Sequence, residues 1–238
     1  IYTDVEGVYT TDPNLIKSAK KIDKISYEEM LEMASLGAKI MQPASIQEAR
    51  LNRIEIDVRS TFSKKIGTTI TRKKNIISKN TIRGISFTKN DSKITLVGVR
   101  DKPGVAASIF KPLYENSINV DMVVQNISAN SRETDLTFTI KLEDLSKTRR
   151  ILENNNSIKF KKLLVNKNVS KVSIIGVGMI TTPGITYRMF KALAKEKINI
   201  EVISTSEIKI SVLINKKNLK KSVEILHQEF KLSNNLWV

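Results

Sequence analysis

The sequence predicts a mixed α/β (α+β) chain in which two ferredoxin-like βαββαβ units follow a shorter α/β segment. This fold class follows from an internal repeat, from apolar residues spaced at strand and helix intervals, and from the composition. Of the 238 residues, 40% are hydrophobic and 27% are charged, which excludes wholesale disorder and allows a sizeable buried core. No apolar run approaches the ~18 residues of a membrane span, so we expect no membrane partner.

Residues 1–62 form the first segment and carry signals for two helices and a strand. Ser26 and Glu29 have the spacing of a capping box, and Pro43 suits the first turn of a second helix. The predicted elements are a helix from about Tyr27 to Leu36, a second from Pro43 to about Asn52, and a strand through Ile54, Ile56 and Val58. Residues 63–81 are polar and basic, and we interpret them as a linker with a short strand near Thr68–Thr71.

The rest of the chain is a tandem repeat, because a shift of eighty residues superposes two copies of one pattern. Each copy has the order strand, helix, two strands and helix, and one more strand completes the ferredoxin-like arrangement. We place the first unit at residues 82–158 and the second at residues 159–238. The matched pairs include Ile94 and Ile174, Val97 and Val177, Gly98 and Gly178, Pro103 and Pro183, Gly104 and Gly184, Phe110 and Phe190, and Asn119 and Asn199.

Hydrophobic spacing places the elements of both copies. The predicted strands are Ile94–Val99, Val120–Ser128 and Leu136–Leu142 in the first copy, and Val172–Val177, Ile200–Ser204 and Ile208–Ile214 in the second. The predicted helices begin near Val105 and Ile185 and, at the end of each copy, span about Leu145–Asn154 and Leu219–Phe230.

The chain has no cysteine and one histidine, His227. A disulfide framework, a thiolate metal site, a cysteine nucleophile and a multi-histidine metal site are therefore excluded, and we expect no metal-binding residues. We expect His227, in the last helical segment, to be packed or at the surface rather than catalytic.

The formal net charge is +16, from 40 Lys and Arg against 24 Asp and Glu. One interpretation is a polyanion partner such as nucleic acid. The other is compositional drift, because Lys, Ile and Asn are abundant together, the lysines are spread along the chain, and aromatic residues are only 5%. We favour drift and expect no specific nucleic acid partner.

The strand-to-helix turn Asp101–Gly104 carries the chemistry of the repeat. The helix behind it points free N–H groups and a positive dipole end at the turn, which suits a carboxylate. On the strand that we expect beside the turn, Asn119 and Asp121 offer acceptors for an ammonium group, and Gln125 and Asn126 offer further polar contacts. Together these groups make a minimal site for a free amino acid. The alternative is that the turn only starts the helix and that Asp121 is solvated.

The motif Pro103-Gly104 with Ile118-Asn119-Val120-Asp121 resembles the ACT domain, a regulatory module that commonly binds amino acids. In the second copy, Gly176–Met179 and Ile203–Ser211 resemble the second ACT domain of aspartate kinases, and this run is long and specific. Two further runs, Tyr2–Pro13 and Ser35–Lys39, resemble the end of the same family's kinase domain. The resemblance covers nearly all 238 residues in the expected order.

The resemblance implies aspartate kinase activity, in which ATP and L-aspartate give ADP and 4-phospho-L-aspartate at the start of lysine, threonine and methionine biosynthesis. It implies a cytoplasmic enzyme, the end of an amino-acid-kinase α/β/α sandwich at residues 1–62, ATP with Mg²⁺ as substrate, and no organic cofactor. The residues implied to border the nucleotide are Thr3, Asp4, Tyr9, Thr10, Thr11, Asp12, Pro13, Asn14 and Lys39. The residues implied to bind lysine, threonine or both as effectors are Asp101, Gly104, Val105, Ala106, Asn119, Asp121, Gln125, Asn126, Ile185, Thr186, Asn199 and Glu201.

The sequence also departs from the family pattern. The family's lysine-bearing phosphate and aspartate motifs and its glycine-rich segments are absent, so we expect a C-terminal piece of the enzyme that is inactive alone. The second turn, Ile180–Gly184, lacks the Arg/Lys-Ser-His run that the family more often has before Pro-Gly, which leaves a purely structural second unit open.

The alternative functions are a non-catalytic ACT regulatory subunit of aspartate kinase and, remotely, a basic nucleic-acid-binding protein. Residues 1–62 argue against the regulatory subunit, because such a chain needs no nucleotide-loop segment. We expect a homo-oligomer or pairing with a second ACT-bearing chain.

Overall fold

The computed structural model of the chain describes residues 1–38, 40–73, 76, 80–127, 133–155 and 158–233. The chain forms two compact units: unit 1 comprises residues 1–88 and 171–238, and unit 2 comprises residues 89–170. The long strands β5 (Gly84–Arg100) and β8 (Lys162–Ile175) contribute residues to both units. In the part of the chain that the structure describes, no helix is long and apolar enough to cross a membrane.

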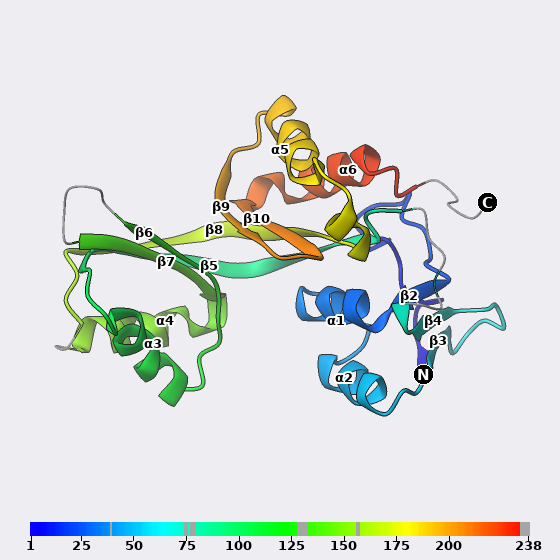
Figure 1. The fold of residues 1–238 in the computed structure, drawn as a ribbon, viewed down its shortest axis with the longest axis horizontal. Coiled ribbons are helices and arrows are strands. Elements are labelled where there is room, and N and C mark those ends of the chain that lie inside the picture. Colours follow the sequence, from blue (N-terminus) through cyan, green and yellow to red (C-terminus); the bar gives the residue numbers. More distant parts are fainter. Residues whose placement is uncertain (39, 74–75, 77–79, 128–132, 156–157, 234–238) are drawn as a thin grey trace. The chain divides into compact units, whose positions relative to one another are not determined.

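The N-terminal part of unit 1 is built around a four-stranded sheet (Figure 1). The strand order is β1-β3-β4-β2, with β1 parallel to β3, β2 parallel to β4, and β3 antiparallel to β4. Its elements are β1 (Tyr2–Thr3), β2 (Lys24–Ser26), α1 (Tyr27–Ser35), α2 (Pro43–Leu51), β3 (Ile56–Ser60) and β4 (Thr68–Thr71). Strand β3 buries Ile56 and Val58 and exposes the residues between them, as the alternation in the sequence predicts.

Helix α1 begins at the predicted capping box. The Ser26 hydroxyl accepts a hydrogen bond from Glu29 N at 3.2 Å, and the Glu29 carboxylate accepts one from Ser26 N at 3.3 Å. Tyr27, Met30 and Met33 on the same helix are buried in an apolar core with the sheet. The cap therefore fixes the start of α1 and holds Glu29 inside unit 1, with only 2% of its surface exposed.

The C-terminal part of unit 1 has the predicted ferredoxin-like order. Its strands run β5-β8-β10-β9, and helices α5 and α6 lie on one face of this sheet (Figure 1). The elements after β8 are a 3-10 turn (Val177–Thr181), α5 (Ile185–Lys195), β9 (Ile200–Thr205), β10 (Lys209–Asn215), a second 3-10 turn (Lys216–Asn218) and α6 (Leu219–Glu229). Ile82 and Ile85 pack in its core, so residues 82–88, which we predict to open the first ACT unit, lie in unit 1.

Unit 2 repeats this arrangement with the strand order β6-β7-β5-β8. Its other elements are α3 (Val105–Glu115), β6 (Val120–Ile127), β7 (Glu133–Lys141), a 3-10 turn (Leu142–Asp144) and α4 (Leu145–Asn154). The core joins one face of α3, through Ile109 and Leu113, to Ile94, Leu96 and Phe138 of the sheet. Helices α3 and α4 therefore cover one face of the sheet (Figure 1).

The backbone conformation confirms the repeat. Gly104 and Gly184 precede α3 and α5 with φ of 85° and 86°, in the left-handed region that glycine occupies without strain. Ser117 and Lys197, which follow the same two helices, have φ of 58° and 57°. The helix entry and the helix exit thus recur at matching positions in both copies.

Both long strands start earlier than the sequence predicts. Strand β5 begins at Gly84 rather than near Ile94, and β8 begins at Lys162 rather than near Val172. The first half of β8 is rich in Lys and Asn and mostly exposed, so its hydrophobic pattern gives no strand signal. Backbone pairing with neighbouring strands extends these segments where side-chain burial does not.

Candidate functional site

Thr3 and Asp4 lie at the carboxyl end of strand β1. Because β1 and β3 are parallel, their carboxyl ends share one edge of the sheet, where Thr61 N and Thr61 Oγ1 donate to Thr3 O at 2.8 and 3.1 Å. The Thr3 hydroxyl accepts from Val5 N at 2.9 Å. Ligands of open α/β sheets bind outside the carboxyl ends of strands, so this edge suits a nucleotide.

The loop Tyr9–Asn14, which we name the nucleotide loop, mixes buried and exposed residues. Asp12 and Asn14 are exposed, and the Asp12 carboxylate accepts from Asn14 N at 2.8 Å, which closes a tight turn. Pro13 is half-buried within that turn. The backbone of Tyr9 forms an isolated antiparallel β-bridge with Lys21. Burial raises the pKa of the Tyr9 phenol above its ordinary value. The loop therefore presents its acidic and amide side chains to solvent on a hydrogen-bonded turn.

Thr10 and Thr11 are buried, with 7% and 3% of their surface exposed. The Thr10 hydroxyl lies 2.9 Å from Nε2 of His227 and accepts from Lys20 N at 3.0 Å. The Thr11 hydroxyl has no hydrogen-bond partner within the described part of the chain. Thr10 thus anchors the nucleotide loop from within, a role that the sequence does not reveal. Lys39, predicted to reach the nucleotide, lies outside the described residues.

His227 is packed rather than exposed, as one of the two predicted placements has it. Its ring is 0% exposed on α6, and Nδ1 lies 3.2 Å from the Ser233 hydroxyl. Burial lowers the pKa of His227 below its ordinary value of 6.5.

We expect His227 to make the protein less stable in acid. Between its lowered folded-state pKa and 6.5, the unfolded chain binds a proton that the folded chain does not. The stabilisation is therefore present above the unfolded-state pKa and is lost as the pH falls through the folded-state pKa. Urea denaturation at about pH 7.5 and about pH 5 should show a larger loss for the wild type than for His227→Gln. Equal losses would contradict this role of the imidazole.

In unit 2, the sheet separates Asp121 from the Asp101–Gly104 turn of the same chain. Strand β7 lies between β5 and β6, with Asp121 opposite Thr139 and Thr139 opposite Lys93. The turn follows the other end of β5, beyond Val99, which is roughly 20 Å further along the strand. The expectation that Asp121 lies on the strand beside the turn is therefore wrong. Strand β7 lies between β5 and β6, and Asp121 is level with Lys93, far along β5 from the turn.

Gln125 and Asn126 lie at the same end of the sheet as the turn. Asn126 pairs with Asp135, whose carboxylate accepts from Gly98 N at 2.9 Å near the end of β5. Residues Asp101, Gly104, Asn119, Asp121, Gln125 and Asn126 are all exposed, and Val105 and Ala106 are half-buried. One chain therefore gathers the helix start, Gln125 and Asn126 at one end, and Asn119 and Asp121 at the other.

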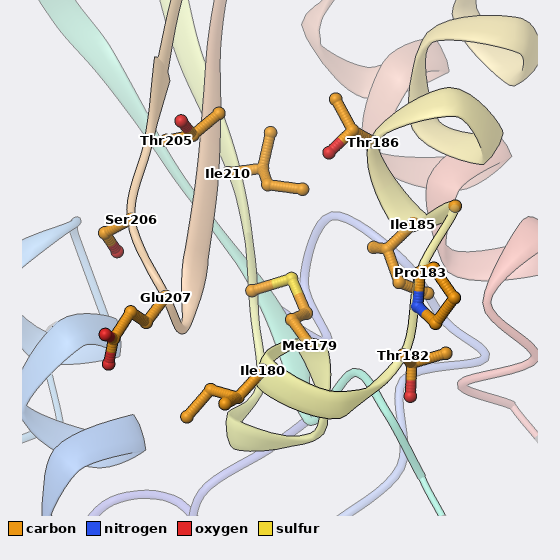
Figure 2. A pocket seen from close by; sticks show the side chains of 11 residues that line it. Met179, Ile180, Thr182, Pro183, Ile185, Thr186, Thr205, Ser206, Glu207 and Ile210 are labelled. Atoms are coloured by element: carbon orange, nitrogen blue, oxygen red, sulfur yellow. The ribbon is translucent and has the colours of Figure 1, made fainter.

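The second ferredoxin-like unit contains a cavity of ≈ 480 Å³ at the start of α5. Figure 2 shows one wall formed by the α5 entry with Ile185 and Thr186, and the facing wall formed by the β9–β10 hairpin with Thr205, Ser206 and Glu207. The remaining lining residues are Met179, Ile180, Thr182, Pro183, Gly184 and Ile210. Cavities of this size hold small molecules.

This cavity is lined by two of the four effector-binding residues predicted in the second ACT unit, residues 159–238. Ile185 and Thr186 line it, whereas Asn199 and Glu201 do not, because they lie at the opposite end of β9. The sequence prediction missed Glu207. It could have found Thr205 and Ser206, since they match Gln125 and Asn126 under the repeat shift.

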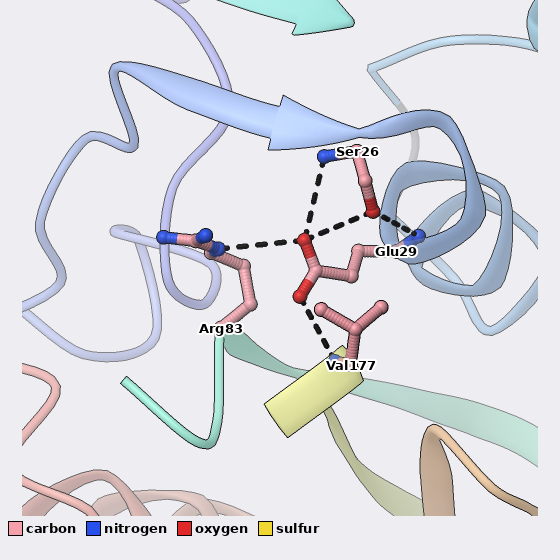
Figure 3. Close-up of polar contacts among 4 residues, drawn as sticks. All are labelled: Ser26, Glu29, Arg83 and Val177. Atoms are coloured by element: carbon pink, nitrogen blue, oxygen red, sulfur yellow. Dashed lines mark hydrogen bonds and ion pairs between the residues drawn. The ribbon is translucent and has the colours of Figure 1, made fainter. Parts of the chain in front are cut away.

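A buried ion pair links α1 to the two segments that flank strands β5 and β8. These segments contain Arg83, just before β5, and Val177, just after β8. Figure 3 shows Oε2 of Glu29 accepting from Ser26 and from Arg83 Nε at 3.5 Å, and Oε1 accepting from Val177 N at 3.0 Å. The Glu29 and Arg83 side chains are 2% and 6% exposed. Lys209 on β10 adds a second, half-buried link to Glu32 of α1 at 3.0 Å. The N-terminal layer and the second ferredoxin-like layer are therefore joined by charge pairs as well as by apolar contacts.

The described residues contain no cluster of three or more His, Cys, Asp or Glu side chains placed to hold a metal ion.

The fold has two ferredoxin-like repeats that follow an α/β segment in one chain, and the family matches divide the chain in the same order. The ACT domain matches residues 94–155 and 172–230, more than half of the chain, and the amino acid kinase family matches residues 1–60. The chain belongs to the ACT domain family. It is 45% identical over 234 residues to the aspartate kinase of Pseudomonas fluorescens, which covers 98% of this chain and 56% of that protein. The chain therefore spans little more than half the length of the curated relatives that it matches.

Solved aspartate kinases share the fold. The aspartate kinase of Clostridium acetobutylicum matches with a TM-score of 0.87 at 26% identity, over 96% of this chain and 53% of that chain. Aspartokinase III of E. coli in complex with aspartate and ADP gives 0.81 at 27% identity, over 96% and 51%, and its complex with lysine and aspartate gives 0.77 at 27%, over 97% and 51%. The regulatory subunit of the Thermus thermophilus aspartate kinase gives 0.60 at 34% identity, over 63% of this chain and 99% of that chain.

Proposed function

We propose that this chain is the C-terminal part of an aspartate kinase whose rate is regulated by amino acids bound at its ACT units. The observation that carries this proposal is one continuous arrangement: residues 1–60 match the amino acid kinase family and two ACT units follow in the same chain. The alignment with the aspartate kinase of Pseudomonas fluorescens runs through 98% of the chain. The proposed reaction joins a carboxylate oxygen of aspartate to the γ-phosphorus of ATP and releases ADP.

The sheet edge at Thr3 and Asp4 and the nucleotide loop are the proposed ATP contacts. Asp12 and Asn14 are exposed on a turn whose backbone is fixed by buried Thr10. Positioning and electrostatic stabilisation do most of the work in phosphoryl transfer, so a rigid loop is the relevant property. Lys39 is proposed to meet phosphate charge, and Mg²⁺ is proposed to accompany ATP. The complex of E. coli aspartokinase III with aspartate and ADP supports both substrates.

Lysine or threonine is the proposed effector, and two copies of the chain are proposed to form its site. Strand β6 is an edge strand of unit 2. Antiparallel pairing of β6 from two copies brings the first residues of one β6 beside the last residues of the other. Asp121 of one copy then lies beside Gln125 of the other, at the end of the sheet where α3 of that other copy begins, so an ammonium acceptor and a helix start share one end of the paired sheets. The E. coli aspartokinase III complex with lysine supports lysine.

A non-catalytic regulatory subunit is the second candidate. The match with the regulatory subunit of the Thermus thermophilus aspartate kinase covers 99% of that subunit but only 63% of this chain. That subunit has no counterpart for over a third of this chain, whereas residues 1–60 match the amino acid kinase family. The kinase proposal accounts for this segment and the regulatory subunit does not.

The full-length product of the gene that encodes these 238 residues is expected to release ADP only when ATP and aspartate are both present. The 238-residue chain expressed alone is expected to show no turnover, since it corresponds to 56% of the relative's length. A coupled assay for ADP and trapping of the acyl phosphate as a hydroxamate measure both. No aspartate-dependent ADP release by the full-length product would refute the kinase proposal and favour the regulatory subunit.

A further inference from the structure

We propose that His227 is a positioning residue for the nucleotide loop, acting through the hydroxyl of Thr10. The inference rests on the proposed function, because it gives a buried side chain of the second ACT unit a part in ATP binding. Thr10 and His227 are 217 residues apart in the chain, yet both belong to unit 1 and their side chains are in contact.

The contact is short and closed to solvent. Nε2 of His227 lies 2.9 Å from Thr10 Oγ1, and Nδ1 lies 3.2 Å from Ser233 Oγ. The imidazole is 0% exposed and Thr10 is 7% exposed. Both ring nitrogens are engaged by neighbouring hydroxyl groups, and the ring does not reach the protein surface. His227 acts on the loop rather than on the reaction.

The hydrogen-bond pattern assigns one neutral tautomer. Lys20 N donates to Thr10 Oγ1 at 3.0 Å, so the Thr10 hydroxyl hydrogen is free to point at Nε2 of His227. Nδ1 then carries the ring proton and donates to Ser233. In this arrangement Lys20 N, Thr10 Oγ1 and Nδ1 of His227 each have an acceptor, and a protonated ring would take away Nε2 as the acceptor of the Thr10 hydroxyl hydrogen.

The main chain of Thr10 is held as firmly as its side chain. Thr10 N donates to Lys20 O at 2.8 Å, and Ile85 N donates to Thr10 O at 2.7 Å. Asp12, whose carboxylate faces solvent in the nucleotide loop, is two residues further on. Removing His227 leaves a buried hydroxyl without its acceptor and frees the side chain that pins the loop.

The test uses the full-length gene product with matched variants. His227→Leu removes both ring contacts, and Thr10→Val removes the hydroxyl at almost constant volume. His227→Gln restores an acceptor for Thr10. Ser222→Ala is the control, because Ser222 is fully buried on the same helix and donates to Asn218 O at 2.9 Å without touching the loop. Steady-state kinetics give KM for ATP, KM for aspartate and kcat, and hydrogen exchange reports protection of residues 9–14.

His227→Leu and Thr10→Val are each expected to raise KM for ATP about five- to tenfold, with KM for aspartate changing less than twofold. The double variant should have the same KM for ATP as His227→Leu alone, since both substitutions remove the same hydrogen bond between Thr10 and His227. His227→Gln should restore most of the affinity, and Ser222→Ala should leave KM for ATP unchanged. The proposal would be overturned if the two substitutions raised KM for ATP multiplicatively in the double variant. An equal rise of KM for ATP in Ser222→Ala would overturn it too.

The two proposals fail in different ways. A wild-type product that binds no ATP and phosphorylates no aspartate would refute the proposed function. Unchanged exchange at residues 9–14 in His227→Leu and Thr10→Val would refute the positioning role while leaving the kinase assignment intact. Faster exchange there, with unchanged exchange in Ser222→Ala, is the expected result.

Discussion

Glu29→Ala is expected to lower the free energy of unfolding by about 3–5 kcal/mol. The Glu29 carboxylate accepts hydrogen bonds from Arg83 Nε and Val177 N and closes the cap of α1 with Ser26. Its removal leaves Arg83 charged and almost fully buried, with 6% of its side chain exposed. An unpaired buried charge costs far more than the lost pair contributes.

Glu28→Ala is the matched control for this experiment. Glu28 neighbours Glu29 on α1 and pairs with Arg50 at 3.4 Å, where the side chains of Glu28 and Arg50 are 37% and 47% exposed. Exposed pairs contribute about 0–1 kcal/mol, so this variant should remain close to the wild type. Urea denaturation followed by circular dichroism measures both variants. If Glu29→Ala and Glu28→Ala were equally stable, the buried ion pair would not hold unit 1 together.

Asp121→Ala is expected to weaken effector binding by about 30-fold or more while leaving the fold intact. Asp121 is exposed at the start of edge strand β6, so its loss costs no core packing. As the proposed partner of the effector's ammonium group, it makes a charge-assisted contact whose removal costs about 2–5 kcal/mol in a desolvated interface. The catalytic rate without effector should stay nearly constant, because an inhibitor acts only through its differential binding to two states.

Titration calorimetry with lysine, with threonine and with both tests this site. Glu115→Ala is the control, since Glu115 is an exposed acidic residue on α3 whose i,i+4 contact with Lys111 at 3.8 Å contributes little. It should bind effector as the wild type does. No heat with the wild type, or identical binding by Asp121→Ala, would contradict the proposed effector site.

Local signals in the sequence predicted local structure well. The capping box at Ser26 and Glu29 and the proline at Pro43 placed the starts of α1 and α2, and α4 runs from Leu145 to Asn154 as expected. Strand β2 has three residues, too few for an alternation pattern to show it. A capping box depends on residues only three positions apart in the chain, so a single sequence reveals it.

Contacts between distant segments were beyond reach of the sequence. The spacing of Asp121 from the Asp101–Gly104 turn says nothing about β7, which comes later in the chain and yet lies between their strands. The pair Thr10–His227 joins positions 217 residues apart, and no local pattern marks either as a contact. Strand order and long-range pairing arise from packing of the whole unit, and only the structure reveals them.

The initial rate of aspartate-dependent ADP release by the full-length gene product, measured with and without lysine and threonine, tests the central claim most directly. We predict that ADP release requires aspartate and that lysine, threonine or the two together lower its rate several-fold to about a hundredfold, as coupling free energies of about 1–3 kcal/mol allow. A rate that is independent of aspartate, or one that neither amino acid changes, would contradict an amino-acid-regulated aspartate kinase.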